Sequence, residues 1–179
     1  MISEIGFSKT NPKIGGNVIN GLFDLYYRIK FGIKIYRNVL TEDERLELIR
    51  DSNKYLIKFP ENPNLQSPSN SHEKFNEQSL KSIQKLLDKI GFTSILRCWS
   101  TYMNPKKIEG CWHKHPVNLT SIYYMENPES LGTVFRVDNK EFRIDVPTNT
   151  LVVIPGYIDH NVPMNITKPR ECLVIDTDE

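Results

Sequence analysis

The sequence predicts an α+β fold: a mostly antiparallel β structure, built as a sandwich or barrel, with helices flanking it. Two segments in the first half carry helix start signals and apolar stripes, and the second half contains seven short runs rich in β-branched and aromatic residues. No helical pattern separates those runs. At 179 residues the chain has single-domain size, so we expect residues 1–179 to form one domain, helical to about residue 91 and β-rich from about residue 92.

The first helix is predicted from a start signal that follows a strand within residues 32–40. Thr41 can cap the helix, and Glu44 lies three residues later, where it can complete a capping box. Acidic residues in the first turn suit the positive end of the helix dipole. A helix over about 42–55 is therefore expected.

A second helix is predicted over about 80–90. Ser79 can cap it, and Gly91 offers the conformation that ends a helix. Between them a stripe of apolar residues recurs at spacings of three and four: Leu80, Ile83, Leu87 and Ile90.

The segment between the two helices, KFPENPNLQSPSNSHEKFNEQ (58–78), contains three prolines and many Asn and Ser residues. Such a composition predicts no regular element. A connection this long inside a compact domain is usually functional or disordered. Two interpretations stay open, a surface connection and a lid over a site.

After Gly91, turn residues separate seven runs with the composition of strands. These are TSILRCWSTYM, CWHKH, LTSIYYM, GTVFRV, KEFRIDV, TLVVIP and ECLVIDT. Runs at this spacing, without helices between them, are typical of an antiparallel sandwich or barrel.

Composition argues against several classes of function. Lys and Arg total 23 against 22 Asp and Glu, so no strong field attracts nucleic acid or an anionic membrane. No apolar stretch approaches the ~20 residues that cross a bilayer. Three cysteines cannot all pair, and the N-terminus lacks the apolar region of a secretory signal. We therefore expect a cytoplasmic protein with reduced thiols.

Three of the four histidines are candidate metal ligands. If residues 111–115 are extended, His113 and His115 point to the same face. His160 ends the later run TLVVIPGYIDH, where Pro155-Gly156 lets the chain bend. Imidazole suits iron, zinc, copper or nickel, and three protein ligands leave positions open for catalysis. The alternative is that each histidine is a hydrogen-bonded surface or core residue.

Arg170 opens the last predicted strand, RECLVIDT, whose two faces are both largely apolar. Such a strand is expected to be buried on both sides, and a buried arginine needs an anion or several acceptors. A guanidinium can bind a carboxylate at two points. An intramolecular salt bridge is the alternative to a bound ligand.

Taken together, these segments resemble the iron(II)- and 2-oxoglutarate-dependent oxygenases, more narrowly the prolyl-hydroxylase-like and phage-type members. The segment KIYRNVLTEDERLELI is similar to the strand, loop and helix that precede the catalytic barrel. HKHP followed by LTSIYYM resembles the first ligand segment. NTLVVIPGYIDHNVPMN followed by an arginine resembles the second histidine strand. The resemblance implies a double-stranded β-helix, a cupin-like jelly-roll barrel with helices packed outside.

The resemblance also implies roles for individual residues. His113 would be the first metal ligand and His160 the distal one. Arg170 would bind the far carboxylate of 2-oxoglutarate, and Tyr124 would donate a hydrogen bond to the same group. Tyr102, eleven residues before the first ligand, falls near a position where related enzymes place an aromatic hydroxyl close to the cosubstrate.

The chain departs from the common His-x-Asp or His-x-Glu pattern, because it reads His-Lys-His. His115 is the favoured third ligand. Alternatively, His113 and His160 alone hold the ion, with His115 hydrogen-bonded outside the coordination sphere. Of the nearby acids, Asp159 should face away from its neighbouring histidine in an extended strand, and Glu109 precedes a glycine in a predicted turn.

The function implied is that of an Fe(II)- and 2-oxoglutarate-dependent dioxygenase, an oxidoreductase that hydroxylates a peptide or protein side chain or a small metabolite, releasing succinate and CO2. Two alternatives stay open. One is a cupin-like three-histidine dioxygenase that does not use 2-oxoglutarate, and the other is a non-catalytic jelly-roll binding module. The absence of a basic stripe interleaved with aromatics argues against a nucleobase substrate.

Overall fold

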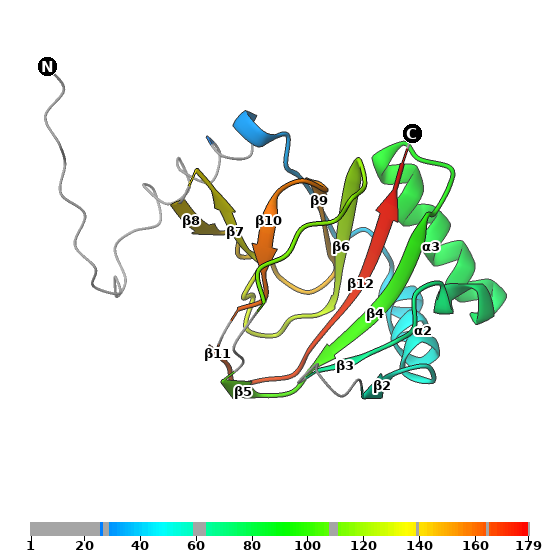
Figure 1. Cartoon of the computed structure of the whole chain (residues 1–179). Coiled ribbons are helices and arrows are strands. Elements are labelled where there is room, and N and C mark those ends of the chain that lie inside the picture. Colours follow the sequence, from blue (N-terminus) through cyan, green and yellow to red (C-terminus); the bar gives the residue numbers. More distant parts are fainter. Residues whose placement is uncertain are drawn as a thin grey trace, which may run out of the picture.

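The computed structural model describes residues 26, 29–58, 64–107, 111–138, 140–163 and 165–178. Helices come before most of the strands, as predicted (Figure 1). The elements are β1 (Lys34–Arg37), α2 (Glu42–Asn53), β2 (Ile57–Lys58), β3 (Leu65–Gln66), the 3-10 helix η1 (Ser71–Lys74), α3 (Glu77–Ile90), β4 (Arg97–Met103), β5 (Lys106–Lys107), β6 (Leu119–Glu126), β7 (Val134–Val137), β8 (Lys140–Arg143), β9 (Thr150–Pro155), β10 (Asp159–Asn161), β11 (Asn165–Ile166) and β12 (Arg170–Thr177).

The strands form one large sheet and two small ones. The large sheet has seven strands in the order β1-β9-β6-β12-β4-β3-β2, and each pairing in it is antiparallel. A three-stranded sheet has the order β10-β7-β8, and β11 pairs with β5. The last strand, β12, lies between β6 and β4 and is buried along its whole length, as expected for a run that is apolar on both faces.

Helices α2 and α3 cover one face of the large sheet, and the β10-β7-β8 sheet lies on the other side (Figure 1). Side chains alternate between these faces along each strand. On β6, Tyr123 packs toward the helices and Tyr124 packs toward the small sheet. On β12, Leu173 and Cys172 divide in the same way. The described residues therefore form a large core on each face of the central sheet.

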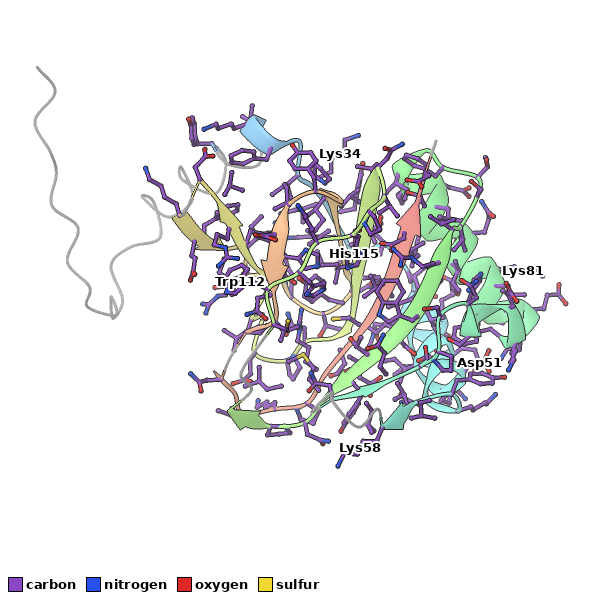
Figure 2. The ribbon with its side chains drawn as sticks, in the orientation of Figure 1. Lys34, Asp51, Lys58, Lys81, Trp112 and His115 are labelled. Atoms are coloured by element: carbon purple, nitrogen blue, oxygen red, sulfur yellow. The ribbon has the colours of Figure 1, made fainter. Side chains whose placement is uncertain are left out.

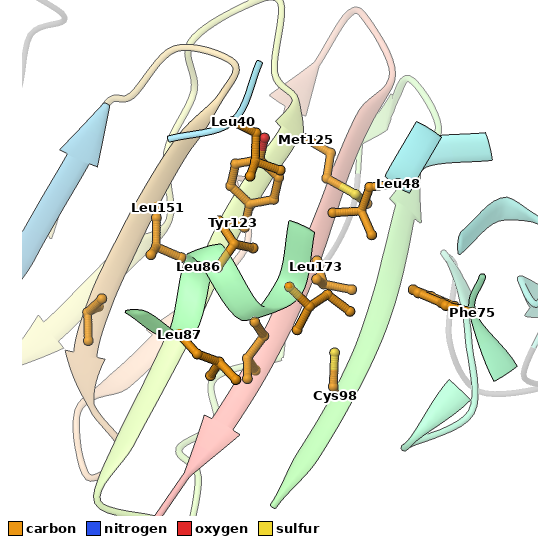
Figure 3. Close-up of a cluster of buried hydrophobic side chains, with 13 residues drawn as sticks. Leu40, Leu48, Phe75, Leu86, Leu87, Cys98, Tyr123, Met125, Leu151 and Leu173 are labelled. Carbon is orange, nitrogen blue, oxygen red and sulfur yellow. The ribbon is translucent and has the colours of Figure 1, made fainter. Parts of the chain in front are cut away.

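We call the first of these the helix-side core, and Figure 3 shows it. It joins the apolar stripes of α2 and α3 to the sheet, and its members include Leu48, Phe75, Ile83, Leu86, Leu87, Cys98, Tyr123, Met125, Leu151 and Leu173. We call the second the inner core, and it includes Tyr124, Phe135, Val152, Ile154 and Cys172. Burial of this apolar area is the main stabilising contribution to the fold.

Both predicted helices form, with small differences at their ends. The capping box of α2 is present: Glu44 N donates to Thr41 Oγ1 over 3.3 Å, and Thr41 N donates to the Glu44 carboxylate over 3.0 Å. Helix α3 starts three residues earlier than predicted. Asn76, rather than Ser79, is its cap and accepts from Ser79 N at 2.9 Å. Gly91 ends this helix at φ +81°, as expected.

The segment between the helices is more regular than predicted. Its described part contains β3 and η1, and β3 pairs with β4 at the edge of the large sheet. Ser67 and Ser71, both buried, bond to one another through their hydroxyls at 2.7 Å. The expectation of no regular element was therefore wrong. Hydrogen bonds between side chains and to the sheet order this segment, and they leave no apolar pattern in the sequence.

Of the seven predicted strand runs, CWHKH is the exception. Residues 111–115 form no regular strand and instead make an isolated antiparallel bridge between His113 and His160. The bend expected at Pro155-Gly156 is present, since β9 ends at Pro155 and β10 starts at Asp159. Within the described ranges, no helix is both long and apolar enough to cross a membrane.

Candidate metal centre

Three histidines from two parts of the chain meet at one point. His113 and His115 lie on the segment before β6, and His160 lies on β10. The two segments are joined by a pair of backbone hydrogen bonds, from His113 N to His160 O at 3.1 Å and from His160 N to His113 O at 2.9 Å. His115 N donates to Gly156 O at 2.9 Å. These contacts place all three imidazoles on the inner side of β10, and Figure 2 shows His115 in the interior.

The imidazoles are close enough to share one ion. Their centroids lie 4.4 Å apart for His113 and His160, 5.0 Å for His115 and His160, and 5.3 Å for His113 and His115. One ligand nitrogen from each lies within 4.8 Å of the others. Nitrogens bound to one ion at about 2.1 Å lie about 3 to 3.5 Å apart in octahedral or tetrahedral geometry, a separation that falls inside this limit.

Each imidazole has its Nδ1 engaged by the protein. Nδ1 lies 3.0 Å from Cys111 O in His113 and 3.0 Å from Ile158 O in His160. In His115 it lies 2.7 Å from a carboxylate oxygen of Asp176. Acceptors at Nδ1 place the proton there and leave the Nε2 lone pair for a metal, the arrangement usual around metal-bound histidines.

The cluster is buried on one side and open on the other. His115 and His160 are buried, whereas His113 is exposed. Burial lowers the pKa of His160 to about 4, with smaller contributions in the same direction from the two neighbouring histidines. At neutral pH that ring is therefore uncharged and can coordinate a cation.

Asp176, on β12, is a site residue that the sequence analysis missed. It is fully buried and contacts His115, Thr120 and Arg97. Burial alone would raise the pKa of Asp176, but the hydrogen bonds from His115 and Thr120 and the charge of Arg97 bring it below its ordinary value. The available signal was an acidic residue inside a largely apolar run that was expected to be buried on both faces.

Arg170 is buried at the start of β12, with 3% of its surface exposed. Its Nη1 lies 3.2 Å from Met103 Sδ, its Nη2 lies 3.4 Å from Thr133 Oγ1, and its Nε has no hydrogen-bond partner. The guanidinium also lies over the Tyr124 ring, 4.9 Å from its centroid. No acid in the described part of the chain pairs with Arg170. The described acids therefore do not form the intramolecular salt bridge that was the alternative to a bound ligand.

Tyr124 and Thr133 complete the group of buried side chains around Arg170, which we call the arginine pocket. The Tyr124 hydroxyl bonds to Thr133 Oγ1 at 2.7 Å and accepts from Thr133 N at 3.0 Å. Burial raises the pKa of Tyr124, so its hydroxyl keeps its proton at neutral pH. Two residues further on, Phe135 lies 6.5 Å from His160, ring centroid to ring centroid. The arginine pocket and the histidine cluster are therefore neighbours on the inner side of β7.

Other residues considered at the sequence level lie elsewhere. Tyr102 pairs with Glu171 and not with Arg170, which places it on the opposite face of β4 from the pocket. Asp159 forms an ion pair with Arg136 at 3.2 Å instead of joining the cluster. Glu109 lies outside the described residues. The fourth histidine, His72, lies in η1 and is not part of the cluster.

Comparisons with known proteins place this geometry in a known architecture. No family model and no curated protein matches the sequence. Among solved structures, a prolyl hydroxylase from Trichoplax adhaerens in complex with a hypoxia-inducible-factor peptide fragment matches over 93% of this chain and 94% of its own, with a TM-score of 0.62 and 14% identity.

Two further structures match with similar scores. The non-heme α-ketoglutarate-dependent epimerase SnoN of nogalamycin biosynthesis covers 90% of this chain and 84% of its own, with a TM-score of 0.66 and 11% identity. HygX from Streptomyces hygroscopicus, with nickel, 2-oxoglutarate and hygromycin B bound, covers 84% of each chain, with a TM-score of 0.65 and 9% identity.

The chain has the fold of the 2-oxoglutarate-dependent oxygenases. The expectation of a double-stranded β-helix with helices packed outside is thereby confirmed. In this oxygenase-type fold the large sheet and the β10-β7-β8 sheet are the two walls of the barrel. The histidine cluster and Arg170 lie between them.

Proposed function

We propose that the chain is an Fe(II)- and 2-oxoglutarate-dependent dioxygenase that hydroxylates its substrate and releases succinate and CO2. The observation that carries this proposal is the buried guanidinium of Arg170, which has no acidic partner among the described residues and lies on the same inner side of the large sheet as the three converging imidazoles. A buried cation of this kind is costly unless an anion pairs with it. A diacid that reaches from the metal to Arg170 satisfies both features.

The residues fit an iron ion and its cosubstrate. His113, His115 and His160 would hold the ion, which supplies the redox and Lewis-acid chemistry when bound. A set of three protein ligands would leave the ion accessible to a cosubstrate. Arg170 would bind the far carboxylate of 2-oxoglutarate, and Tyr124, which keeps its proton, would donate a hydrogen bond to the same carboxylate.

The protein's own part is binding, orientation and exclusion of water. The inner core beside the cluster is apolar, with Phe135 and Cys172 fully or almost fully buried. The exposed side of His113 gives the direction from which a substrate can approach. None of the described side chains is assigned the role of a general base in this scheme, because the bound iron and cosubstrate would supply the redox chemistry.

For the substrate we propose a peptide or protein side chain or a small metabolite. The Trichoplax prolyl hydroxylase contains a bound peptide, and HygX contains the small molecule hygromycin B, so the fold accommodates both classes. We propose a cytoplasmic location, which is supported by the three cysteines, all of which are free.

The proposal is tested by titrating 2-oxoglutarate into the Fe(II)-loaded protein without oxygen and then measuring succinate after air is admitted. The wild-type chain should bind 2-oxoglutarate and form succinate. Arg170→Gln should keep the metal but bind 2-oxoglutarate about ten- to a hundredfold more weakly, because a hydrogen bond to a charged group contributes about 1.5–3 kcal/mol. Arg50→Gln, on the exposed surface of α2, is the matched control and should behave as wild type.

Two outcomes would favour the alternatives. A metal-loaded chain that neither binds 2-oxoglutarate nor forms succinate would indicate a cupin-like three-histidine dioxygenase that acts without this cosubstrate. A chain that takes up no metal would indicate a non-catalytic jelly-roll binding module.

A further inference from the structure

Among the described residues, Asp176 is the acid that hydrogen-bonds directly to the histidine cluster. Its Oδ1 accepts from Thr120 Oγ1 at 2.8 Å and lies 2.7 Å from His115 Nδ1, while its Oδ2 forms an ion pair with Arg97 Nη2 at 2.7 Å. The carboxylate is fully buried between β4 and β6. Three groups thus fix its position and orientation.

This contact decides the tautomer of His115. An ionised carboxylate only accepts hydrogen bonds, so a nitrogen 2.7 Å from it must carry the proton. The other ring nitrogen, Nε2, then has its lone pair available toward His113 and His160. In His113 and His160 the acceptor at Nδ1 is a backbone carbonyl oxygen, which carries no net charge. His115 therefore differs from the other two histidines, because the acceptor at its Nδ1 is an anion.

The charge matters because the three candidate ligands are all imidazoles. In the His-x-Asp pattern that the sequence resembles, a carboxylate ligand offsets one of the two charges of the metal ion. In this chain His115 occupies that position. The carboxylate of Asp176 hydrogen-bonds to the Nδ1 side of the His115 ring, away from the proposed ion. A hydrogen bond from imidazole to carboxylate makes the ring a more basic ligand.

Resting on the proposed metal centre, we propose that Asp176 is a positioning residue which holds His115 with Nε2 toward the ion and provides, through the imidazole, the negative charge that a carboxylate ligand would otherwise supply. Asp176 would not touch the ion. Its effect would appear in the affinity for the metal alone, before any cosubstrate is present.

The first test is titration of Co²⁺ into the metal-free protein, for wild type and Asp176→Asn. We expect the variant to bind Co²⁺ about ten- to a hundredfold more weakly, the usual cost of removing such a partner. Asp51→Asn is the matched control, since Asp51 is also buried but lies on the helix side of the sheet. It should leave Co²⁺ affinity unchanged even where it lowers stability.

The second test separates a role of charge from general structural support. His115→Asp restores a carboxylate at the ligand position and places it beside the buried Asp176. In that background Asp176→Asn should raise Co²⁺ affinity or leave it unchanged, because it removes a repulsive neighbour. Equal losses of affinity in both backgrounds would overturn the proposed role of charge.

A third measurement needs no variant. In the metal-free wild-type protein at neutral pH, ¹⁵N NMR of the histidine rings should show the proton of His115 on Nδ1. A ring that carries its proton on Nε2 and none on Nδ1 would overturn the proposal. A wild-type chain that binds no Co²⁺ would refute the metal centre and the proposed function together, whereas normal Co²⁺ binding by Asp176→Asn would refute the role of Asp176 alone.

Discussion

Arg170 brings a permanent positive charge into the interior of the barrel. Its contacts with Met103 Sδ, Thr133 Oγ1 and the Tyr124 ring are all to uncharged groups. These contacts orient the guanidinium but do not neutralise it. At the scale of single residues, this unneutralised charge is the reason for proposing an anion as the partner of Arg170, with the neighbouring hydroxyl groups as its further hydrogen-bond partners.

The paired tyrosines of β6 give a prediction at this scale. Tyr124→Phe removes the acceptor of the buried Thr133 N–H and the donor proposed for 2-oxoglutarate. We expect a loss of about 1–3 kcal/mol in the free energy of unfolding and a two- to tenfold weaker affinity for 2-oxoglutarate. Urea unfolding and calorimetric titration measure the two effects.

Tyr123→Phe is the matched control for this prediction. Tyr123 also donates a hydrogen bond, to Asn149 Oδ1 at 2.9 Å, but it belongs to the helix-side core. Its loss should lower stability and leave the affinity for 2-oxoglutarate at the wild-type value. Equal weakening of 2-oxoglutarate binding by both variants would contradict the assignment of Tyr124 to the pocket.

At the scale of elements, the segment 111–115 is the part of the site with the least regular structure. It carries two of the three proposed ligands but makes only an isolated bridge with β10. On the outer side of this bridge, Trp112 lies under the Arg136 guanidinium, 4.2 Å from ring centroid to Cζ, and Arg136 also pairs with Asp159 (Figure 2 labels Trp112). These contacts with β7 and β10 hold the segment in place.

Gly156 adds a second restraint on the same segment. A Cβ atom at this position would lie 2.1 Å from Val117 O and 2.9 Å from His115 O, closer than atoms can approach. Glycine therefore allows the backbone after β9 to pass against the residues that follow the ligands. The bend and the ligand segment are fitted to one another through backbone contacts.

Removal of the cation–π contact tests this role of β7. Arg136→Met should increase hydrogen exchange of the backbone amides in residues 111–115 and weaken Co²⁺ binding about two- to fivefold, since such a contact contributes about 0.5–1 kcal/mol. Arg143→Met, on neighbouring β8 and paired with Asp145, is the control. Unchanged exchange in the Arg136 variant would show that the segment is held by other contacts.

At the scale of the whole molecule, the helices support the sheet from the side opposite to the site. Asp51 of α2 links the two helices: it accepts from Asn76 N at 2.6 Å and pairs with Lys54 at 2.7 Å. Burial acts to raise the pKa of Asp51, but the hydrogen bonds from Lys54 and Asn76 N outweigh it and hold the pKa below its ordinary value.

This shift predicts how stability depends on pH. Because the folded-state pKa of Asp51 is lowered, its contribution is fully present above the unfolded-state pKa of about 3.9 and is lost as pH falls through the folded-state value. Asp51→Asn should therefore lower the free energy of unfolding at pH 7 by about 1–3 kcal/mol, and the difference should shrink below about pH 4.

Urea unfolding of both proteins between pH 7 and pH 3 checks this prediction. Asp88→Asn, on the exposed side of α3, should stay within about 0.5 kcal/mol of wild type at each pH. A difference between wild type and Asp51→Asn that grows toward acid pH would contradict the predicted sign of the effect.

Sequence patterns predicted those parts of the fold that depend on near neighbours. The capping box at Thr41 and the glycine at the end of α3 are local signals, and both are used as expected. The start of α3 was wrong because Asn76 and Ser79 are both good caps. Contacts with Asp51 and Glu47, on another helix, favour the first of them.

In the candidate site too, features that depend on local sequence were predicted and those that depend on distant strand pairing were not. Convergence of His113, His115 and His160 was predicted from strand alternation and from the order of the segments, and the structure brings the three together. Tyr102 was misplaced because spacing along the chain does not give the register of β4 against β12. Asp176 was missed because its approach to the cluster depends on a pairing with residues more than fifty positions away.

The measurement that tests the central claim most directly is a crystal structure of the protein grown with Ni²⁺ and 2-oxoglutarate. We predict one ion bound by His113, His115 and His160, with the far carboxylate of 2-oxoglutarate on the Arg170 guanidinium. An ion bound elsewhere, or the three imidazoles without an ion while Arg170 contacts protein atoms alone, would contradict the account.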